Sequence, residues 1–501
     1  MRYAGKALTF TLLLTAALAL AAVALAAVTG PPRGTRIISP PGGKPSAVGP
    51  SDATDYVLDG AHGGTPVSDP IVATPRPMDN IEFSQDNRLV LFAAFQSKDS
   101  LAGTNADGHS HIYLFTRKRH QQTTGGLLSG TLKRVDPNSN GDSVKPSIDG
   151  QTVTGNRATK PNCIVFQSTS NLGGVNTGGK WVVYLYKIKG GGISRISEPG
   201  DDARDPVVDG RCDSVTYEQG GTVKVRKIGG PVKEIAQGFD PDQQTDGEGV
   251  AYDRAGGPGG HNQVWYTPFS FKGGFSKGGE KLVSVNKHGT SNTDTGNDDS
   301  TMPSVNDNGA YIAFESKADD LCNGSRQRCD TDDQNGHITD VFRRTMGGKK
   351  APTNDVMQMI SFDGKEQFQS DLDSDQVKIT GAGEQACFRS FGVETHNNKF
   401  HRDRHTGPFE HIYFWNFPRE RMIGAFSGES KEDRSSTSEL KREDGTAAFN
   451  FSCGISNHGN FIGFTSDTEH MASDRNGASL DVFIRFMGGS DEGKSGDVGG
   501  R

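Results

Sequence analysis

Long apolar segments, aromatic residues and excess positive charge are all scarce in this chain. After an N-terminal apolar run no second long one follows, so we expect no stable membrane insertion once that run is removed. Aromatic residues make up 8% of the 501 residues and hydrophobic residues 33%, against 66 glycines, which favours short strands and polar turns over packed helices. The formal net charge of −7 argues against nucleic-acid binding, which needs clustered Lys and Arg.

The N-terminus is typical of a secretory signal peptide. Arg2 and Lys6 precede an apolar run from Leu8 to Ala27, and Ala24-Leu25-Ala26 supplies the small residues of a cleavage site. A single membrane-spanning anchor is the alternative, because the run approaches the roughly 20 residues that a span requires. We expect residues 1–27 to be removed and the mature protein to be secreted or periplasmic.

Six cysteines in an exported chain predict three disulfides, because oxidising compartments allow them to form. Cys322 and Cys329 are close enough in the sequence to close a local loop, so we expect this pair to be joined. The other four fall in consecutive repeats, where they either pair between neighbouring sheets or stay as buried thiols: Cys163, Cys212, Cys387 and Cys453.

A repeated unit covers most of the chain. It consists of a turn built on Asp, Asn or Gly, an alternating apolar strand and, after a gap, a strand rich in aromatic and β-branched residues; clear copies begin at Asp149, Asn308 and His458. Counting the closing strands gives seven repeats, at 79–136, 143–197, 204–236, 237–285, 300–361, 371–426 and 449–487. This pattern predicts an all-β, seven-bladed β-propeller of four-stranded meanders, with six or eight blades as alternatives.

The last repeat lacks a closing strand, and residues 35–39 match the closing strands of the other repeats. We therefore expect this segment, within an extended leader over 28–78, to complete the last blade and close the ring. Closure of this kind removes an exposed sheet edge. The propeller is expected over 79–487 and a disordered tail over 488–501.

The unit resembles the TolB-type, WD40-like propeller repeat (PD40), which joins a Ser-Pro-Asp-Gly-like turn to Ile-Ala-Phe-like, Ile-Tyr-like and Arg-Leu-Thr-like strands. The matching pieces here are Ser304–Gly309 with Tyr311–Ser316, then Asp340–Phe342, then Met359–Ser361. The resemblance covers most of 79–487 and implies a secreted bacterial propeller that serves as an interaction module. It does not carry over TolB's own role in the outer-membrane system, since TolB has an additional N-terminal domain.

Long polar insertions fall mostly in the connections from second to third strands and between blades, which leave the same face of a propeller. They cover 98–110, 286–300, 317–339, 390–410, 428–446 and 467–480. Loops on a rigid scaffold carry function more often than strands do. This side of the ring, which we call the long-loop face, is the expected binding face.

An Asx-Gly loop before the third strand recurs and offers oxygen ligands for Ca²⁺, which takes 6–8 of them. We predict calcium as the cofactor of these loops, with ligands at Asp333, Asn335, Asp340, Asp474, Asn476 and Asp481. The alternative is structural, because Asx side chains also close tight turns with their own backbone.

Four histidines gather in the sixth repeat: His396, His401, His405 and His411. His401 and His405 are spaced to share a helix face and to bind zinc. His411 stands where other repeats have Asp340 and Asp481, which favours a role at the start of a strand.

No reaction follows from the repeats themselves, because propellers carry unrelated functions. The chain has no Ser-x-Asp-x-Gly-x-Thr-Trp box of the kind that recurs in sialidases. We expect no catalytic residues and a non-catalytic scaffold that binds a protein or polysaccharide partner. The alternative is a carbohydrate-active hydrolase or lyase that uses two carboxylates in the central channel.

Overall fold

The structure is a computed structural model of the chain, and only part of the chain is described. The described residues are 35–37, 82–83, 91–97, 107, 109–117, 131–136, 140–149, 161–289, 291–322, 329, 333, 335–346, 356–363, 368–369, 372–390, 411–416, 421–424, 450–455, 459, 461–466 and 481–486. The predicted signal peptide and C-terminal tail lie outside them. Within this part of the chain, no helix is long and apolar enough to cross a membrane.

Antiparallel sheets make up nearly all of the described chain. The first three are β2 (Glu82–Phe83), β3 (Leu91–Ser97), β4 (His111–Arg117) and β5 (Thr131–Arg134); β6 (Ser143–Ile148), β7 (Cys163–Ser168), β8 (Val182–Lys187) and β9 (Ile193–Arg195); and β10 (Ala203–Val208), β11 (Ser214–Gln219), β12 (Thr222–Lys227) and β13 (Val232–Gln237). The fourth sheet contains β14 (Phe239–Gln243), β15 (Gly249–Ala255), β16 (Asn262–Ser270), β17 (Ser276–Lys277) and β18 (Lys281–Leu282), with the short 3-10 helix η1 (Pro258–Gly260) between β15 and β16.

The remaining sheets follow the same strand order. They are β19 (Ser300–Val305), β20 (Tyr311–Ser316), β21 (Asp340–Thr345) and β22 (Met357–Met359); β25 (Ser374–Ile379), β26 (Gln385–Ser390), β27 (His411–Asn416) and β28 (Arg421–Gly424); and β29 (Asn450–Ile455), β30 (Phe461–Ser466), β31 (Asp481–Phe486) and β1 (Thr35–Ile37). A separate pair joins β23 (Phe362–Asp363) to β24 (Phe368–Gln369).

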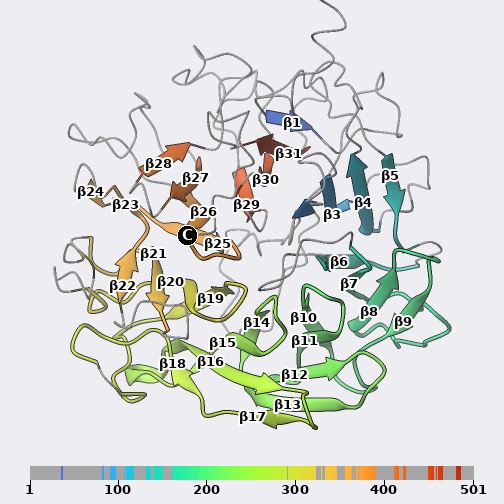
Figure 1. Cartoon of the computed structure of the whole chain (residues 1–501), viewed down its shortest axis with the longest axis horizontal. Coiled ribbons are helices and arrows are strands. Elements are labelled where there is room, and N and C mark those ends of the chain that lie inside the picture. The colour runs from blue at the N-terminus through green and yellow to red at the C-terminus, as the bar shows by residue number, and fades with distance from the viewer. Residues whose placement is uncertain are drawn as a thin grey trace, which may run out of the picture.

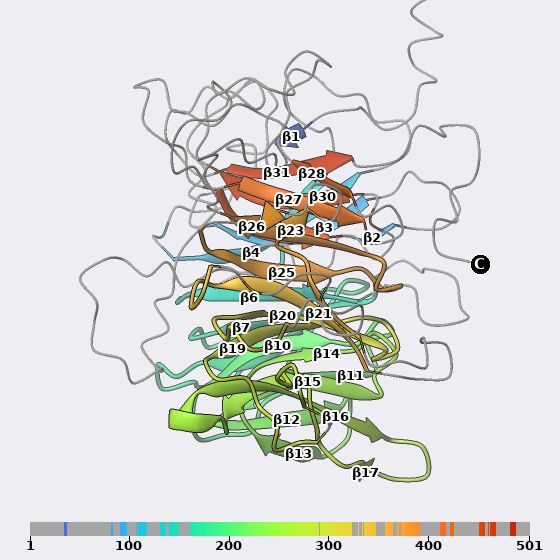
Figure 2. The same ribbon diagram turned by 90° about the vertical axis from the view of Figure 1, so that its left-hand side faces the viewer.

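These sheets form an all-β, propeller-like arrangement around a common centre (Figure 1), with β6, β10, β14, β19, β25 and β29 as the innermost strands of their sheets. Seen from the side, the strands run from one face of the arrangement toward the other, so their loops gather at two opposite faces (Figure 2). Six sheets have four strands, and one has five because both β17 and β18 pair with β16. The expectation of uniform four-stranded blades therefore needs correction: the outer edge of the β14–β18 sheet is split.

The N-terminal strand belongs to the last sheet. β1 pairs antiparallel with β31, with Thr35 opposite Arg485 and Ile37 opposite Phe483. The fourth strand of this sheet thus comes from the opposite end of the chain, and it is shorter than the predicted segment 35–39.

Apolar cores lie between neighbouring sheets, and an aromatic pair recurs in them. A phenylalanine of the second strand stands opposite an aromatic residue of the third strand in four sheets: Phe95–Tyr113, Phe166–Tyr184, Phe314–Phe342 and Phe388–Tyr413, with ring centroids 5.9, 6.1, 5.7 and 5.6 Å apart. Each such pair adds about 0.5–1.5 kcal/mol beyond the burial of its area. The alternating apolar residues that mark the repeats in the sequence are therefore residues that pack in these cores.

All six cysteines are paired. The predicted local bond between Cys322 and Cys329 is confirmed, with Cα atoms 5.2 Å apart. Of the two alternatives left open for the others, pairing between neighbouring sheets is correct: Cys163 joins Cys212 and Cys387 joins Cys453.

Candidate functional site

An aspartate immediately before the innermost strand ties each of four sheets to the sheet before it. Its carboxylate accepts a hydrogen bond from the backbone N–H at the start of the third strand in the preceding sheet. The four pairs are Asp142 with Ser110 at 2.9 Å, Asp202 with Trp181 at 2.7 Å, Asp299 with Asn262 at 2.7 Å and Asp373 with Thr339 at 2.8 Å. Hydrogen bonds to a charged acceptor are stronger than neutral ones. We call these contacts the Asp latches.

The Asp latches bring inter-blade connections and second-to-third connections together at one face. This is the arrangement expected for the long-loop face, since each latch joins the end of one kind of loop to the end of the other. Much of the predicted loop sequence, including 98–106, 391–410, 425–449 and 467–480, lies outside the described residues. The described residues include the ends of these connections, next to the strands.

A cluster of histidine and aspartate side chains surrounds one latch. His261, between η1 and β16, places Nδ1 3.1 Å from Asp298 Oδ1 and 3.5 Å from Asp299 Oδ1. His337, in the connection from β20 to β21, places Nδ1 2.9 Å from the other oxygen of Asp298. Nothing in the sequence pattern pairs these histidines, which are 76 positions apart along the chain by their numbers.

The predicted calcium residues behave mainly as turn and strand-start residues where they are described. Asp333 Oδ1 accepts a hydrogen bond from the backbone N–H of Asn335 at 3.2 Å, the contact of an Asx turn. Asp340 is buried at the start of β21, where it accepts a hydrogen bond from the hydroxyl of Ser361. Among the described His, Cys, Asp and Glu residues, neither belongs to a group of three close metal-ligand atoms. Calcium binding here stays a prediction.

The other predicted metal residues have little or no description. Asp474 and Asn476 lie outside the described residues, as do His396, His401 and His405. Asp481 and His411 begin β31 and β27, which agrees with a strand-start position, but their side chains are not described.

A second group of polar residues lies at bulges in the innermost strands. Five of these strands contain a non-glycine residue with positive φ: Lys145 (54°), Asp205 (50°), Asp240 (44°), Met302 (51°) and Gln376 (57°). Each lies at a shift in strand register. A left-handed conformation costs a non-glycine residue about 1–2 kcal/mol, so the bulges require compensating contacts.

At three of the five bulges, a side chain of the preceding sheet supplies such a contact. The backbone N–H of Lys145 donates to Gln96 at 2.8 Å, that of Asp205 to Gln167 at 2.7 Å, and that of Gln376 to Glu315 at 3.3 Å. The three acceptors occupy the same place, directly after the aromatic residue of the second strand. Polar groups near the centre of the ring are thus used to hold neighbouring sheets together.

Two carboxyl groups at this acceptor position are strongly perturbed. Burial raises the pKa of Asp253 well above its usual range, and the nearby Asp240 raises it further. Burial likewise raises the pKa of Glu315, with a further contribution from Asp375, while Arg389 lowers it. Arg389 itself forms a two-pronged ion pair with Asp375, at 2.8 and 2.6 Å.

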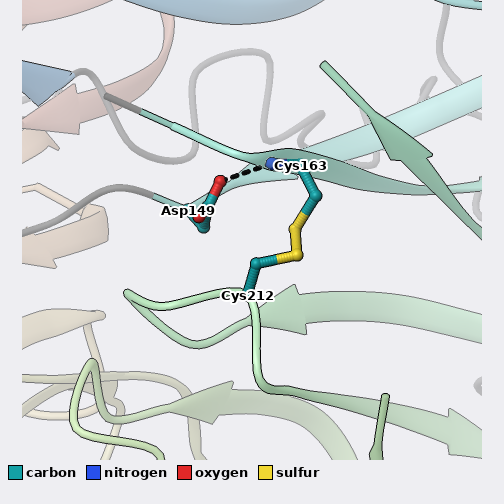
Figure 3. A group of neighbouring side chains, drawn as sticks. All are labelled: Asp149, Cys163 and Cys212. Carbon is teal, nitrogen blue, oxygen red and sulfur yellow. Dashed lines mark hydrogen bonds between the residues drawn. A yellow bond between two sulfur atoms is a disulfide. The ribbon is translucent and has the colours of Figure 1, made fainter. Parts of the chain in front are cut away.

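A third group, shown in Figure 3, contains Asp149 and the disulfide between Cys163 and Cys212. The ligand atoms lie within 4.8 Å of one another, but the sulfur atoms are bonded to each other and are therefore not thiolate ligands. Asp149 Oδ1 accepts the backbone N–H groups of Asn162 and Cys163, both at 2.6 Å. Burial raises the pKa of Asp149 to about 7, although these donors lower it. The group joins the end of β6 to the start of β7.

Comparisons with known proteins find distantly similar solved structures but no family. No family model matches the chain, and no curated protein matches it. Among solved structures, the β-propeller domain of the Trilobed protease from Pyrococcus furiosus is 8% identical, with 82% of this chain and 95% of that chain covered and a TM-score of 0.44. TolB from Acinetobacter baumannii is 9% identical, with 69% and 79% covered and a TM-score of 0.34. The tricorn protease is 10% identical with a TM-score of 0.31, and the match covers 78% of this chain but only 28% of that one.

Proposed function

We propose that this chain is a secreted, non-catalytic propeller that binds a protein or polysaccharide partner through the long-loop face. The observation that carries the proposal is the set of Asp latches. They hold the bases of the inter-blade and second-to-third connections in fixed positions, as a loop-based binding surface requires. Three buried side chains of the second strands, Gln96, Gln167 and Glu315, are by contrast occupied in supporting the bulges.

The finer architecture and the location form part of the same proposal. We propose seven blades, with the five-stranded sheet taken as one of them, and closure of the ring by β1, which pairs with β31. Three disulfides are in keeping with export, because such bonds persist in the oxidising compartments outside the cytoplasm. We assign the chain to the TolB-type repeat family on its repeat motifs, with removal of residues 1–27 on export.

A pair of matched surface variants tests the binding face. Lys180 and Lys189 are both exposed and flank the same strand, β8, but Lys180 lies in the second-to-third connection and Lys189 in the hairpin to β9. Partners are first captured on the mature protein from the native secretome and from an array of purified polysaccharides. Lys180→Glu is then expected to weaken binding of the captured partner, and Lys189→Glu to leave it unchanged. The reverse pattern would place the binding face on the hairpin side.

A carbohydrate-active enzyme is the second candidate, favoured by the raised pKa values of Asp253 and Glu315, since a general acid needs a carboxyl group that stays protonated. Their exposed fractions of 1% and 8% leave little surface for a sugar to contact. A Gly-x-Ser-x-Gly sequence at 274–278 offers no alternative, because Ser276 lies exposed in the short strand β17, not in a strand-to-helix elbow. Release of reducing or unsaturated sugar ends that disappears in Asp253→Asn would establish this candidate.

A further inference from the structure

The cluster around His261 has the composition of a transition-metal site. It joins two imidazole groups, of His261 and His337, to the carboxylates of Asp298 and Asp299. Two neutral imidazoles and two carboxylates carry a charge of about −2, which matches a divalent cation. The nitrogen donors favour Zn²⁺ over Ca²⁺ and Mg²⁺, which prefer sites made of oxygen ligands alone.

The distances from His261 to the two carboxylates fit tetrahedral zinc. Zinc lies about 2.0–2.2 Å from nitrogen and carboxylate oxygen ligands, so neighbouring ligands of a tetrahedral site are about 3.3 Å apart. His261 Nδ1 is 3.1 Å from Asp298 Oδ1 and 3.5 Å from Asp299 Oδ1. All three ligand atoms lie within 4.8 Å of one another.

Backbone groups hold the carboxylates in place before any metal binds. The N–H of Asp299 donates to Asp298 Oδ1 at 2.7 Å, and the N–H of Asn262 donates to Asp299 Oδ1, also at 2.7 Å. The side chain of Gln263 donates to the carbonyl of Asp298 at 2.9 Å. Outer contacts of this kind orient the ligands of a metal site and increase its affinity.

His337 supplies the remaining ligand. Its Nδ1 is 2.9 Å from Asp298 Oδ2, so the imidazole borders the carboxylate at the centre of the cluster. It is 61% exposed and comes from a different connection than His261, which leaves it free to adjust to an ion. The three contributing segments precede β16, β19 and β21, so an ion would cross-link two neighbouring sheets on the long-loop face.

We propose that His261, Asp298 and Asp299, together with His337, bind one zinc ion on the long-loop face. The ion would strengthen the latch between Asp299 and Asn262 by joining the same two sheets a second time. This site is independent of the partner-binding function proposed above, and it is distinct from the histidine group at 396–411 considered from the sequence.

Zinc titration of the full mature protein, followed by calorimetry and by the visible spectrum of the cobalt-substituted form, tests the site. We expect one tight equivalent and a cobalt spectrum typical of tetrahedral coordination. His261→Ala should weaken zinc binding by more than about 100-fold, beyond the 10–100-fold effect of losing an outer contact. His337→Ala should alter the cobalt spectrum and weaken binding to a smaller degree.

Two control variants make the outcome decisive. His109 is the matched control, because its Nδ1 lies 3.5 Å from Asp142 at another latch but no second histidine is paired with that carboxylate among the described contacts. His109→Ala should leave zinc binding unchanged. The double variant of His401 and His405 to Ala should also retain the tight equivalent. Loss of zinc binding in that double variant, with normal binding in His261→Ala, would overturn the proposal, and so would the absence of tight binding in the unmodified protein.

Discussion

The two disulfides between neighbouring sheets should stabilise the fold more than the local disulfide does. A disulfide restricts the unfolded chain, and the loss of chain entropy grows with the length of the closed loop. The Cys163–Cys212 bond spans a sequence separation of 49, whereas the Cys322–Cys329 bond spans 7. The chain-entropy relation then gives about 4 kcal/mol for the first and about 2.5 kcal/mol for the second.

Paired Cys→Ala variants measure this difference. Urea unfolding of the variants under non-reducing conditions should show the free energy of unfolding reduced by about 1.5 kcal/mol more in the Cys163/Cys212 variant than in the Cys322/Cys329 variant. The dependence of that free energy on urea should also steepen, because the unlinked chain exposes more surface. Cys387–Cys453, with a separation of 66, should resemble Cys163–Cys212 and serves as an internal control. An equal or larger loss in the Cys322/Cys329 variant would refute the reasoning.

Three further outcomes are expected. In thermal melts, Glu315→Gln should stabilise the fold near pH 7 and lose this advantage toward pH 4, because the raised pKa of Glu315 makes the folded wild type lose stability as pH rises. The Gln side chain can still accept the N–H of Gln376, as Gln167 accepts the corresponding N–H in another sheet. A wild type more stable than the variant at pH 8 would contradict this. Deletion of 35–39 should lower the melting temperature and promote aggregation by exposing a sheet edge, and an unchanged melt with monomeric elution would count against ring closure. If the Asp333 loop binds calcium, the ion at about 100 times its Kd should raise the free energy of unfolding by about 2.7 kcal/mol, and Asp333→Asn should reduce this gain. A melting curve that does not change on chelation would mean that Asp333 only forms the turn.

The repeats were readable from the sequence because the sheets are assembled from neighbouring segments, apart from β1 in the last sheet. Alternating apolar residues and short turns mark strands whose partners can lie a few residues away, as in the pairing of β11 with β12, where Gln219 lies opposite Thr222. The local cysteine pair was readable for the same reason. The predicted uniform blade missed the split edge of the β14–β18 sheet, where two short strands share one partner.

The polar contacts between sheets carried a signal that the sequence interpretation did not use. An aspartate stands directly before the innermost strand at Asp142, Asp202, Asp299 and Asp373, and Gln or Glu follows the second-strand phenylalanine at Gln96, Gln167 and Glu315. Such a recurring residue, in register with the repeat, indicates a shared contact even when its partner is unknown. These positions turned out to be the Asp latches and the supports of the bulges.

The sequence by itself determined the strands and their grouping into repeats, because these depend on local patterns of burial and turn formation. Only the tertiary structure decided which distant side chains meet. His261, Asp298 and His337 come from three connections in two neighbouring sheets, and Glu315 and Asp375 gain their mutual repulsion only when their two sheets pack. Such groups are brought together by the angle and spacing between sheets, which depend on the packing of whole surfaces and have no periodic trace in the chain.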